Sequence, residues 1–277
     1  MIQDLDNKKL YNEYENIEAM SVEKVFYFEN DKMYIRTDEN GEPKLLTAAD
    51  FAHTKLQYLF RIEDTRYFLA MDGRDGEYIK NLSGVIQTSA RNLRDLKHKE
   101  LAFAAATAYH LYQWYRDNQF CGRCGFRTQH GSGERMLKCP SCGNAIYPKI
   151  APAVIVALTD GDRIMMTKYN GRAYKRYALI AGFTEIGETA EETVIREVKE
   201  EVGLKAKNVR YYKSQPWGTD MDLLLGYFCE LDGDDQIQMD KDELSTAEWV
   251  HRNDMDIEDD GFSLTQEMMC AFKKGEF

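Results

Sequence analysis

The sequence lacks any apolar segment of the length that membrane proteins use. Its first twenty residues, MIQDLDNKKLYNEYENIEAM, contain no apolar core of signal-peptide length. No later apolar run approaches the roughly 20 residues needed to span a bilayer. Internal repeats and low-complexity tracts are also absent. We therefore expect a folded globular protein in the cytoplasm.

Positive charge is scarce as well. The 277 residues carry 36 Lys and Arg against 47 Asp and Glu, a formal net charge of -11. Such a chain repels phosphate backbones, so general nucleic-acid binding is disfavoured, and a phosphate-bearing ligand must be met by local cations or a bound metal ion. A hydrophobic content of 43% suffices for the cores of one large domain or two ordinary ones.

The sequence also lacks the cysteine pattern of a disulfide framework. Two of the six cysteines, Cys229 and Cys270, stand alone, and the other four form two CxxC pairs. Each CxxC turn can direct two thiolates at one point, and two facing turns make a closed tetrahedral site that suits zinc. The sequence therefore predicts a zinc ribbon with the ligands Cys121, Cys124, Cys139 and Cys142.

The alternative to this zinc site is a pair of redox dithiols. A redox motif is expected after a strand in a βαβ unit, and two such motifs are not expected fourteen residues apart. Four thiolates leave no coordination position for water, so the zinc is expected to be structural. His130 lies between the pairs. We expect it to be an exposed loop residue and not a ligand.

The first 95 or so residues mix β-prone runs, such as those at 25–28 and 32–36, with polar turns. This pattern is typical of a small α+β domain, and it does not indicate what that domain does. Apolar residues at spacings of three and four then predict an amphipathic helix over 97–117. We expect this helix to connect two domains.

After Tyr147 the pattern becomes one of strands. AVIVAL (153–158) and RIMMTKY (163–169) flank a turn that contains Asp160-Gly161, which predicts a β-hairpin. Further strands are predicted at 177–183, 209–214 and 222–231.

Between these strands lies a segment unusually rich in glutamate. Thr189 and Glu192 have the spacing of a capping box and Gly203 is a natural stop, which predicts a helix over 190–202. Separations of three and four place three glutamates on one face, with no lysine among them to relieve their repulsion: Glu197, Glu200 and Glu201. Clustered carboxylates are what Mg²⁺ or Mn²⁺ requires, and the alternative is an acidic surface helix.

The stretch from Gly182 to Leu204 resembles the Nudix box, G-x5-E-x7-R-E-U-x-E-E-x-G-U, in which U is aliphatic. Every fixed position matches, including Glu188 and Arg196. The resemblance implies hydrolysis of a nucleoside diphosphate linked to another moiety. It also implies an α/β/α sandwich with a mixed sheet, within a chain whose fold class is α+β overall.

The resemblance further implies roles for individual residues. Glu197 and Glu201 should bind the metal, Glu200 should be a third ligand or the base for the attacking water, and the carbonyl of Ala181 should be a backbone ligand. Arg196 should orient a glutamate through charge-assisted hydrogen bonds. The segment 240–249 resembles the one that supplies a further carboxylate, which makes Glu243 a candidate ligand. The alternative is an exposed glutamate at the start of a helix.

SQPW at 214–217 and YPKIAP at 147–152, which follows the four-cysteine segment, resemble the NAD(H) diphosphatase branch of this superfamily. That branch cleaves NAD(H) into NMN(H) and AMP and forms homodimers. The resemblance implies substrate contacts at Arg91, Glu134, Tyr147, Phe183, Gln215, Trp217 and Asp222.

The sequence departs from this branch after Trp217, where relatives usually continue with Pro-Phe-Pro-x-Ser. Here Gly218-Thr219-Asp220-Met221-Asp222 follows, so two prolines that would stiffen the loop are missing and an acid replaces a neutral serine. ADP-ribose, other dinucleotides and NAD-capped RNA therefore remain alternative substrates. A nucleotide sensor without hydrolase activity is the alternative of another class. The predicted domains are an N-terminal α+β domain with the linking helix (1–117), a zinc ribbon (118–146) and a Nudix domain (147–277).

Overall fold

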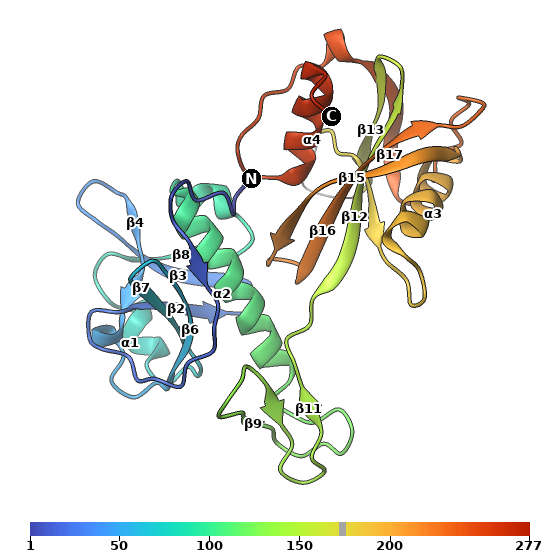
Figure 1. Cartoon of the computed structure of the whole chain (residues 1–277). Helices are drawn as coiled ribbons and strands as arrows, with labels where there is room; N and C mark the ends of the chain where they lie inside the picture. The colour runs from blue at the N-terminus through green and yellow to red at the C-terminus, as the bar shows by residue number, and fades with distance from the viewer. Residues whose placement is uncertain (172–175) are drawn as a thin grey trace. The chain divides into compact units, whose positions relative to one another are not determined.

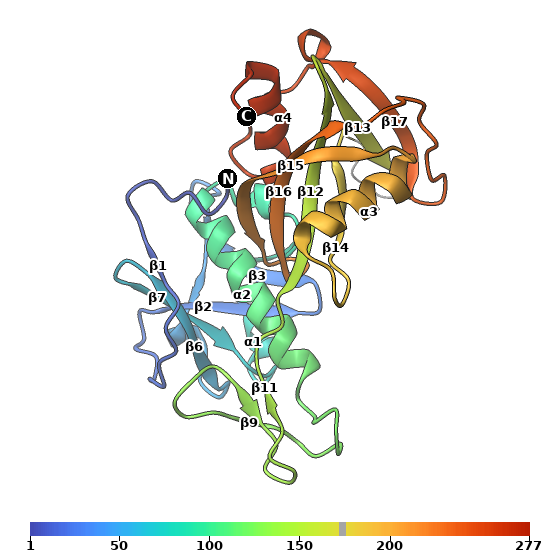
Figure 2. The same cartoon turned by 45° about the vertical axis from the view of Figure 1, so that its right-hand side comes forward.

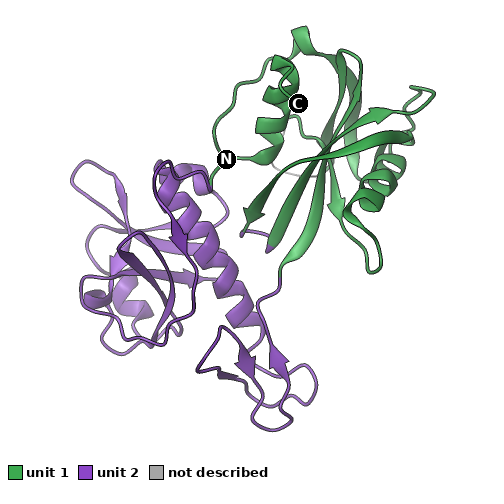
Figure 3. Ribbon diagram, viewed as in Figure 1, with its two compact units in different colours: residues 1–2, 150–217, 222–277 green, residues 3–149, 218–221 purple. Residues whose placement is uncertain are grey.

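The computed structural model describes residues 1–171 and 176–277. Contacts divide these residues into two compact units (Figure 3). Unit 1 comprises Met1–Ile2, Ile150–Trp217 and Asp222–Phe277, and unit 2 comprises Gln3–Lys149 and Gly218–Met221. The sequence predicted three domains, with boundaries at 117 and 146. The division into two units does not test these boundaries, so they remain predictions.

Unit 1 is a sheet with a helix on each face. Its elements are β12 (Ala151–Asp160), β13 (Arg163–Tyr169), β14 (Ile180–Phe183), α3 (Ala190–Val202), β15 (Ala206–Trp217), β16 (Asp222–Leu231), β17 (Leu244–His251) and α4 (Leu264–Lys274). The strand order is β15-β16-β12-β13-β17, and β14 also pairs with β12. The β12–β16 pair is parallel and the others are antiparallel, so the sheet is mixed.

The side chains of β12 alternate between the two faces of the sheet, and this explains why a helix covers each face. Val154, Val156 and Leu158 belong to the buried cluster that contains the α3 valines, whereas Ile155 and Ala157 belong to the cluster under α4. Successive side chains of a strand point to opposite faces, so an uninterrupted apolar strand needs a cover on both. Figures 1 and 2 show α3 and α4 on opposite faces of this sheet. The predicted α/β/α sandwich with a mixed sheet is confirmed.

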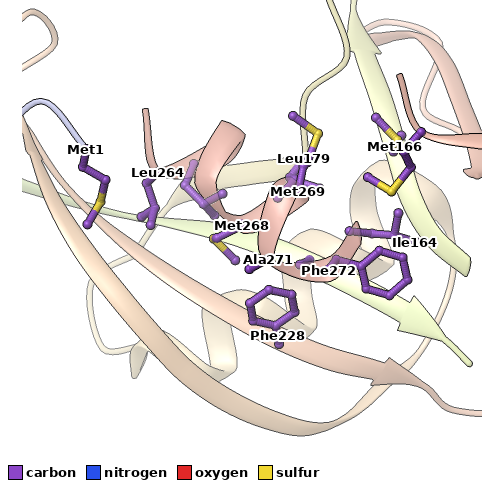
Figure 4. Packing of buried hydrophobic residues seen from close by; sticks show 13 residues of the cluster. Met1, Ile164, Met166, Leu179, Phe228, Leu264, Met268, Met269, Ala271 and Phe272 are labelled. Carbon is purple, nitrogen blue, oxygen red and sulfur yellow. The ribbon is translucent and has the colours of Figure 1, made fainter. Parts of the chain in front are cut away.

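The cluster under α4 is one of the two cores in unit 1. Figure 4 shows Met268 and Phe272 of α4 beside Ile164 and Phe228 of the sheet. All four side chains are buried. Burying one side chain of this size contributes about 1.5 to 3 kcal/mol, so this face holds α4 firmly on the sheet.

The sequence predicted part of this unit. The hairpin of β12 and β13 is confirmed, with Asp160 opposite Arg163, and the strand predicted over 222–231 coincides with β16. The strand predicted over 177–183 is too long, because β14 begins at Ile180. The strand predicted over 209–214 is too short, because β15 extends from Ala206 to Trp217 and pairs with β16 through two irregularities.

Unit 2 contains an antiparallel-rich sheet, α2 and the cysteine segment. Its elements are β1 (Leu10–Tyr11), β2 (Lys24–Glu29), β3 (Lys32–Thr37), β4 (Pro43–Lys44), β5 (Leu46–Thr47), β6 (Leu56–Ile62), β7 (Thr65–Ala70), α1 (Gly76–Lys80), β8 (Val85–Ser89), α2 (Lys99–Asp117), β9 (Gln129–His130), β10 (Leu137–Lys138) and β11 (Ala145–Ile146). The sheet order is β1-β6-β7-β2-β3-β4, with β5 on β2 and β8 on β3, and β11-β10-β9 form a separate three-stranded ribbon.

Helix α2 covers part of this sheet. The predicted helix over 97–117 is confirmed, although it begins at Lys99. The ring of Phe28 on β2 lies 5.3 Å from that of Tyr109 and 5.1 Å from that of Tyr112, both on α2. Within the described residues no helix, α2 included, is both long and apolar enough to span a bilayer.

Candidate functional site

The glutamate-rich helix α3 has the bounds that its caps predict. The Thr189 hydroxyl accepts a hydrogen bond from Glu192 N at 3.2 Å, and the Glu192 carboxylate accepts one from Thr189 N at 2.8 Å. Gly203 ends the helix in the left-handed conformation with φ 74°. Val194, Val198 and Val202 are fully buried, which fixes the rotation of the helix and turns Glu197 and Glu201 inward.

Glu197 lies directly against the backbone of β14. A Cβ built on Gly182 would be 1.8 Å from Glu197 Oε1 and 2.0 Å from its Cδ. Any side chain at this position would therefore collide with the carboxylate. The glycine that opens the glutamate-rich stretch is needed for the close approach of helix and strand.

Glu201, one turn further along, is 1% exposed. Its Oε1 accepts hydrogen bonds from Ala181 N at 3.3 Å and from the Tyr169 hydroxyl at 3.2 Å. Its Oε2 is buried, and no hydrogen-bond partner for it exists among the described residues. Burial, with the charges of Glu197 and Glu243 adding to it, raises the pKa of Glu201 to about 8. A buried carboxylate oxygen without a partner is costly unless a cation faces it.

Arg196 connects the carboxylates of the stretch. Its Nε and Nη2 donate to the two oxygens of Glu188 at 2.6 and 3.0 Å, and its Nη1 donates to Glu197 at 2.7 Å and to Glu200 at 2.8 Å. Nη2 also donates to the carbonyl of Phe183 at 2.9 Å. The expectation of an unrelieved carboxylate face was therefore wrong. Arg196 relieves the repulsion from within the helix, because a guanidinium has enough donors for several acceptors.

Glu243 precedes β17, and its carbonyl accepts a hydrogen bond from Asn170 N at 2.7 Å. Burial raises the pKa of Glu197 and of Glu201, and the charge of Glu243 adds to both shifts. Glu243 is exposed, as the alternative expected, but it lies in the turn before β17 and not at the start of a helix.

The segment before Glu243 is fixed to the end of α3. Gln238 N donates to the carbonyl of Val202, and Asp240 N donates to the carbonyl of Glu201, both at 2.9 Å. These bonds satisfy carbonyls that the end of a helix leaves without partners. They also bring the segment that carries Glu243 to the end of α3, although more than forty residues separate Glu243 from Glu197 and Glu201.

This arrangement fits a hard divalent cation. It offers carboxylates at Glu197, Glu200, Glu201 and Glu243 and the backbone oxygen of Ala181, and all-oxygen donor sets suit Mg²⁺ or Mn²⁺. The partnerless Oε2 of Glu201 is the observation that favours such an ion. Among the described residues, the four cysteines are the only group in which three or more ligand atoms all lie within 4.8 Å of one another. The carboxylate oxygens of the glutamates are therefore farther apart than the cysteine sulfurs.

The four cysteines form one group in the ribbon. The Sγ atoms of Cys121 and Cys142 are 3.6 Å apart, and those of Cys124 and Cys139 are 3.5 Å apart. Backbone N–H groups, chiefly that of Arg123, lower the pKa of Cys121 to about 6. A closed group of four thiolates suits a structural zinc ion.

His130, which was expected to be an exposed loop residue, is in β9 and half-buried. Its ring lies 5.0 Å from that of Tyr115. Burial lowers the pKa of His130 to about 4. The packing of the ribbon against α2, which the sequence pattern did not reveal, is the reason for the difference.

The residues expected to contact substrate fall in both units. In unit 2 the Tyr147 hydroxyl donates to Glu134 at 3.0 Å. In unit 1 Phe183 is exposed at the end of β14, and Trp217, at the end of β15, pairs with Asp222, the buried first residue of β16.

Gln215 does not fit its expected role. It is fully buried, its Nε2 donates to the carbonyl of Phe262 and its Oε1 accepts from Leu264 N, both at 2.8 Å. The side chain positions the start of α4 and is not available to a substrate.

The loop after Trp217 has partners that the sequence did not indicate. Arg91 Nη1 donates to Asp220 at 2.6 Å, so the guanidinium expected to meet substrate is paired with the altered loop. The buried Gln113 of α2 donates to the carbonyls of Gly218 and Thr219, both at 3.3 Å. Tyr169, which bonds Glu201, was also missed. None of these contacts joins neighbours in sequence, so no local pattern could have found them.

Comparisons with known proteins agree with this geometry. The NUDIX domain family matches residues 149–271, and the NADH pyrophosphatase zinc ribbon domain family matches residues 116–147. The chain is 38% identical over 169 residues to the NAD-capped RNA hydrolase NudC of Enterobacter sp. (strain 638), covering 61% of this chain and 65% of that protein. It is 35% identical over 176 residues to the protein of the same name from Erwinia tasmaniensis, covering 63% and 67%. The chain thus spans about two thirds of the length of these relatives.

Among solved structures, the chain is similar to a NUDIX hydrolase from Nitrosomonas europaea. The two share 17% sequence identity with a TM-score of 0.46, over 56% of this chain and 91% of the other.

Proposed function

The chain belongs to the Nudix family and carries the zinc ribbon of NADH pyrophosphatases, and from this premise we propose that it hydrolyses the diphosphate bond of NAD(H)-type dinucleotides to NMN(H) and AMP. The observation that carries the proposal is the buried Oε2 of Glu201, which has no hydrogen-bond partner among the described residues. A sensor that only binds a nucleotide has no need for such a costly group beside Glu197 and Glu243.

The carboxylates Glu197, Glu200, Glu201 and Glu243, with the carbonyl of Ala181, would hold Mg²⁺ or Mn²⁺. When bound, such an ion neutralises the diphosphate and makes water a better nucleophile. Arg196 holds Glu197 and Glu200 in place through its hydrogen bonds. Glu200, whose side chain is 59% exposed, is the glutamate of α3 best placed to accept a proton from solvent water. The zinc at the four cysteines would be structural.

The substrate class rests on the aromatic residues and the relatives. Phe183 and Trp217 in unit 1, and Tyr147 in unit 2, each offer a ring face on which a planar base can stack. Phe183 and Tyr147 are more than half exposed, which a ring needs in order to receive a ligand. The proposal includes a cytoplasmic homodimer, which the family resemblance supports.

NAD-capped RNA is the second candidate substrate. The relatives that the chain matches are named NAD-capped RNA hydrolase. The bond broken would be the same diphosphate bond, and the RNA chain would extend from the adenosine side.

Product analysis tests the proposal. The protein is incubated with NADH, NAD, ADP-ribose or FAD plus Mg²⁺ or Mn²⁺, in parallel with RNA carrying a 5′ NAD cap, and the products are separated by chromatography. We expect NMN(H) and AMP from NAD(H), and no products from the Glu201→Gln variant. Binding of NADH without products under all metal conditions would identify the protein as a sensor instead.

A further inference from the structure

Unit 2 contains a cavity of about 650 Å³ that the proposed hydrolysis does not use. Three parts of the unit line it: strands β2 and β7 of the sheet, the second half of α2, and the ribbon from Arg127 to Leu137. Ligand sites for small molecules commonly have volumes of roughly 300 to 1,000 Å³, so the cavity can hold a nucleotide.

Aromatic rings form the inner wall. Tyr115 is buried, and the half-buried ring of His130 lies 5.0 Å from it. The ring of Tyr112 is also half-buried and packs against Phe28. Tyr112 and His130 therefore keep ring surface that the protein does not cover. Such faces stack on nucleic-acid bases of any sequence.

Cations form the rim. The cavity is lined by four basic side chains, Lys55, Arg74, Arg116 and Arg127, and by two acidic ones, Glu29 and Asp72. All four basic residues are exposed. This is a local excess of positive charge in a chain whose net charge is -11.

Both acidic residues of the cavity, and two of its four basic residues, are already in ion pairs. Asp72 pairs with Arg74, and Glu29 pairs with Lys80 from outside the cavity at 2.9 Å. Arg116 pairs with Asp117, and its guanidinium also lies 5.6 Å from the ring of Tyr112.

The other two basic residues of the rim, Arg127 and Lys55, are not in ion pairs with carboxylates in the described part of the chain. The Arg127 guanidinium lies 6.0 Å from the Phe120 ring, and Lys55 is close enough to His130 for its charge to act on that ring. An arginine with free donors suits a phosphate, because its planar guanidinium matches phosphate geometry.

We propose that this cavity binds a nucleotide, with its base against Tyr112 and His130 and its phosphate at Arg127 and Lys55. The same chemistry would accept a free mononucleotide or one nucleotide of an RNA chain. The zinc ribbon supplies one wall, so the ribbon would have a binding role besides its structural one.

Hydrogen-exchange mass spectrometry localises the binding. The full zinc-loaded chain, without added Mg²⁺ or Mn²⁺, is mixed with AMP or with a five-nucleotide RNA bearing a 5′ hydroxyl, which contains no diphosphate bond. We expect slower exchange in residues 69–74, 112–119 and 127–130. Protection by both probes identifies a mononucleotide site, and protection by the RNA alone identifies an RNA site. Protection confined to 182–202, or absent with both probes, overturns the proposal.

Two matched variants separate specific binding from net charge. Arg127→Gln is expected to weaken binding of the effective probe about tenfold, the loss typical of a hydrogen bond to a charged group. Arg210→Gln makes the same change on β15 of unit 1, outside the cavity, and is expected to have no effect. Equal weakening by both variants overturns the proposal. Zinc content and the thermal midpoint show that Arg127→Gln folds, and Lys55→Gln provides a second test.

Discussion

Gly182 and Glu197 approach so closely that a methyl group on the glycine would lie 1.8 Å from the carboxylate oxygen Oε1. The contact joins β14 to α3 and determines where the Glu197 carboxylate lies. A displacement of the order of 1 Å in a reacting group can lower the rate about 100-fold.

Gly182→Ala should therefore lower kcat/KM for NADH by about 100-fold, because Glu197 must move to admit the methyl group. Steady-state kinetics measures the loss, and circular dichroism checks the fold. Gly133→Ala is the control, since a Cβ there meets nothing within 4 Å. Parent activity in Gly182→Ala would show that the position of Glu197 does not matter to the reaction.

Glu201→Gln should lower turnover at least about 100-fold while the protein remains folded, because it removes the charge of a proposed metal ligand at almost constant volume. The matched control is Glu191→Gln, which removes one charge from the exposed side of the same helix. Turnover at saturating Mn²⁺ is the measurement. Equal activities of the two variants would place the reaction elsewhere.

The stability of the protein without Mg²⁺ or Mn²⁺ should fall as the pH rises from about 4.5 to about 8. The pKa of Glu201 is raised from 4.5 to about 8, so the folded state holds this proton more tightly than the unfolded state. The resulting stabilisation is complete below pH 4.5 and is lost as the pH passes 8.

Chemical denaturation at pH 5 and pH 8 measures this effect. Each pKa unit corresponds to about 1.4 kcal/mol, and we expect the parent to lose roughly 1 to 3 kcal/mol more than Glu201→Gln between these two values. Addition of Mg²⁺ at pH 8 should restore stability to the parent and not to the variant. Parallel pH profiles for the two proteins would contradict the prediction.

Purified protein should contain about one zinc ion per chain, because four thiolates within 4.8 Å of one another form a closed site. Cys139→Ser should lose this zinc and unfold the ribbon, whereas Cys270→Ser should retain it. Elemental analysis gives the ratio. A parent protein without zinc would refute the assignment.

Trp217→Ala should remove a stacking contact worth roughly 1 to 3 kcal/mol and lower kcat/KM for dinucleotides accordingly. A small diphosphate substrate without the stacked base should be hydrolysed almost as well by the variant as by the parent. Tyr211→Ala removes another aromatic residue that is 55% exposed on the same strand and serves as the control. An equal loss on both substrates would mean that Trp217 supports the fold and not the base.

The sequence determined α3 to the residue, because a capping box and a terminal glycine are local signals. It did not reveal β17 or α4 as elements, because each is defined by partners far along the chain. The same distinction applies to the site. The spacing of Glu197, Glu200 and Glu201 is visible within two helical turns, whereas the pairing of Arg91 with Asp220 joins residues 129 positions apart.

Gln238 and Asp240 donate hydrogen bonds to the last carbonyls of α3, so the length of this helix determines where the segment 238–240 is bound. One inserted residue would turn the following part of the helix by about 100° and move those carbonyls away from the segment that carries Glu243. In the course of evolution, insertions and deletions should therefore collect in the exposed stretch just after β16 and be purged from α3. The number of residues in 190–202, and not only their identity, therefore matters to the site.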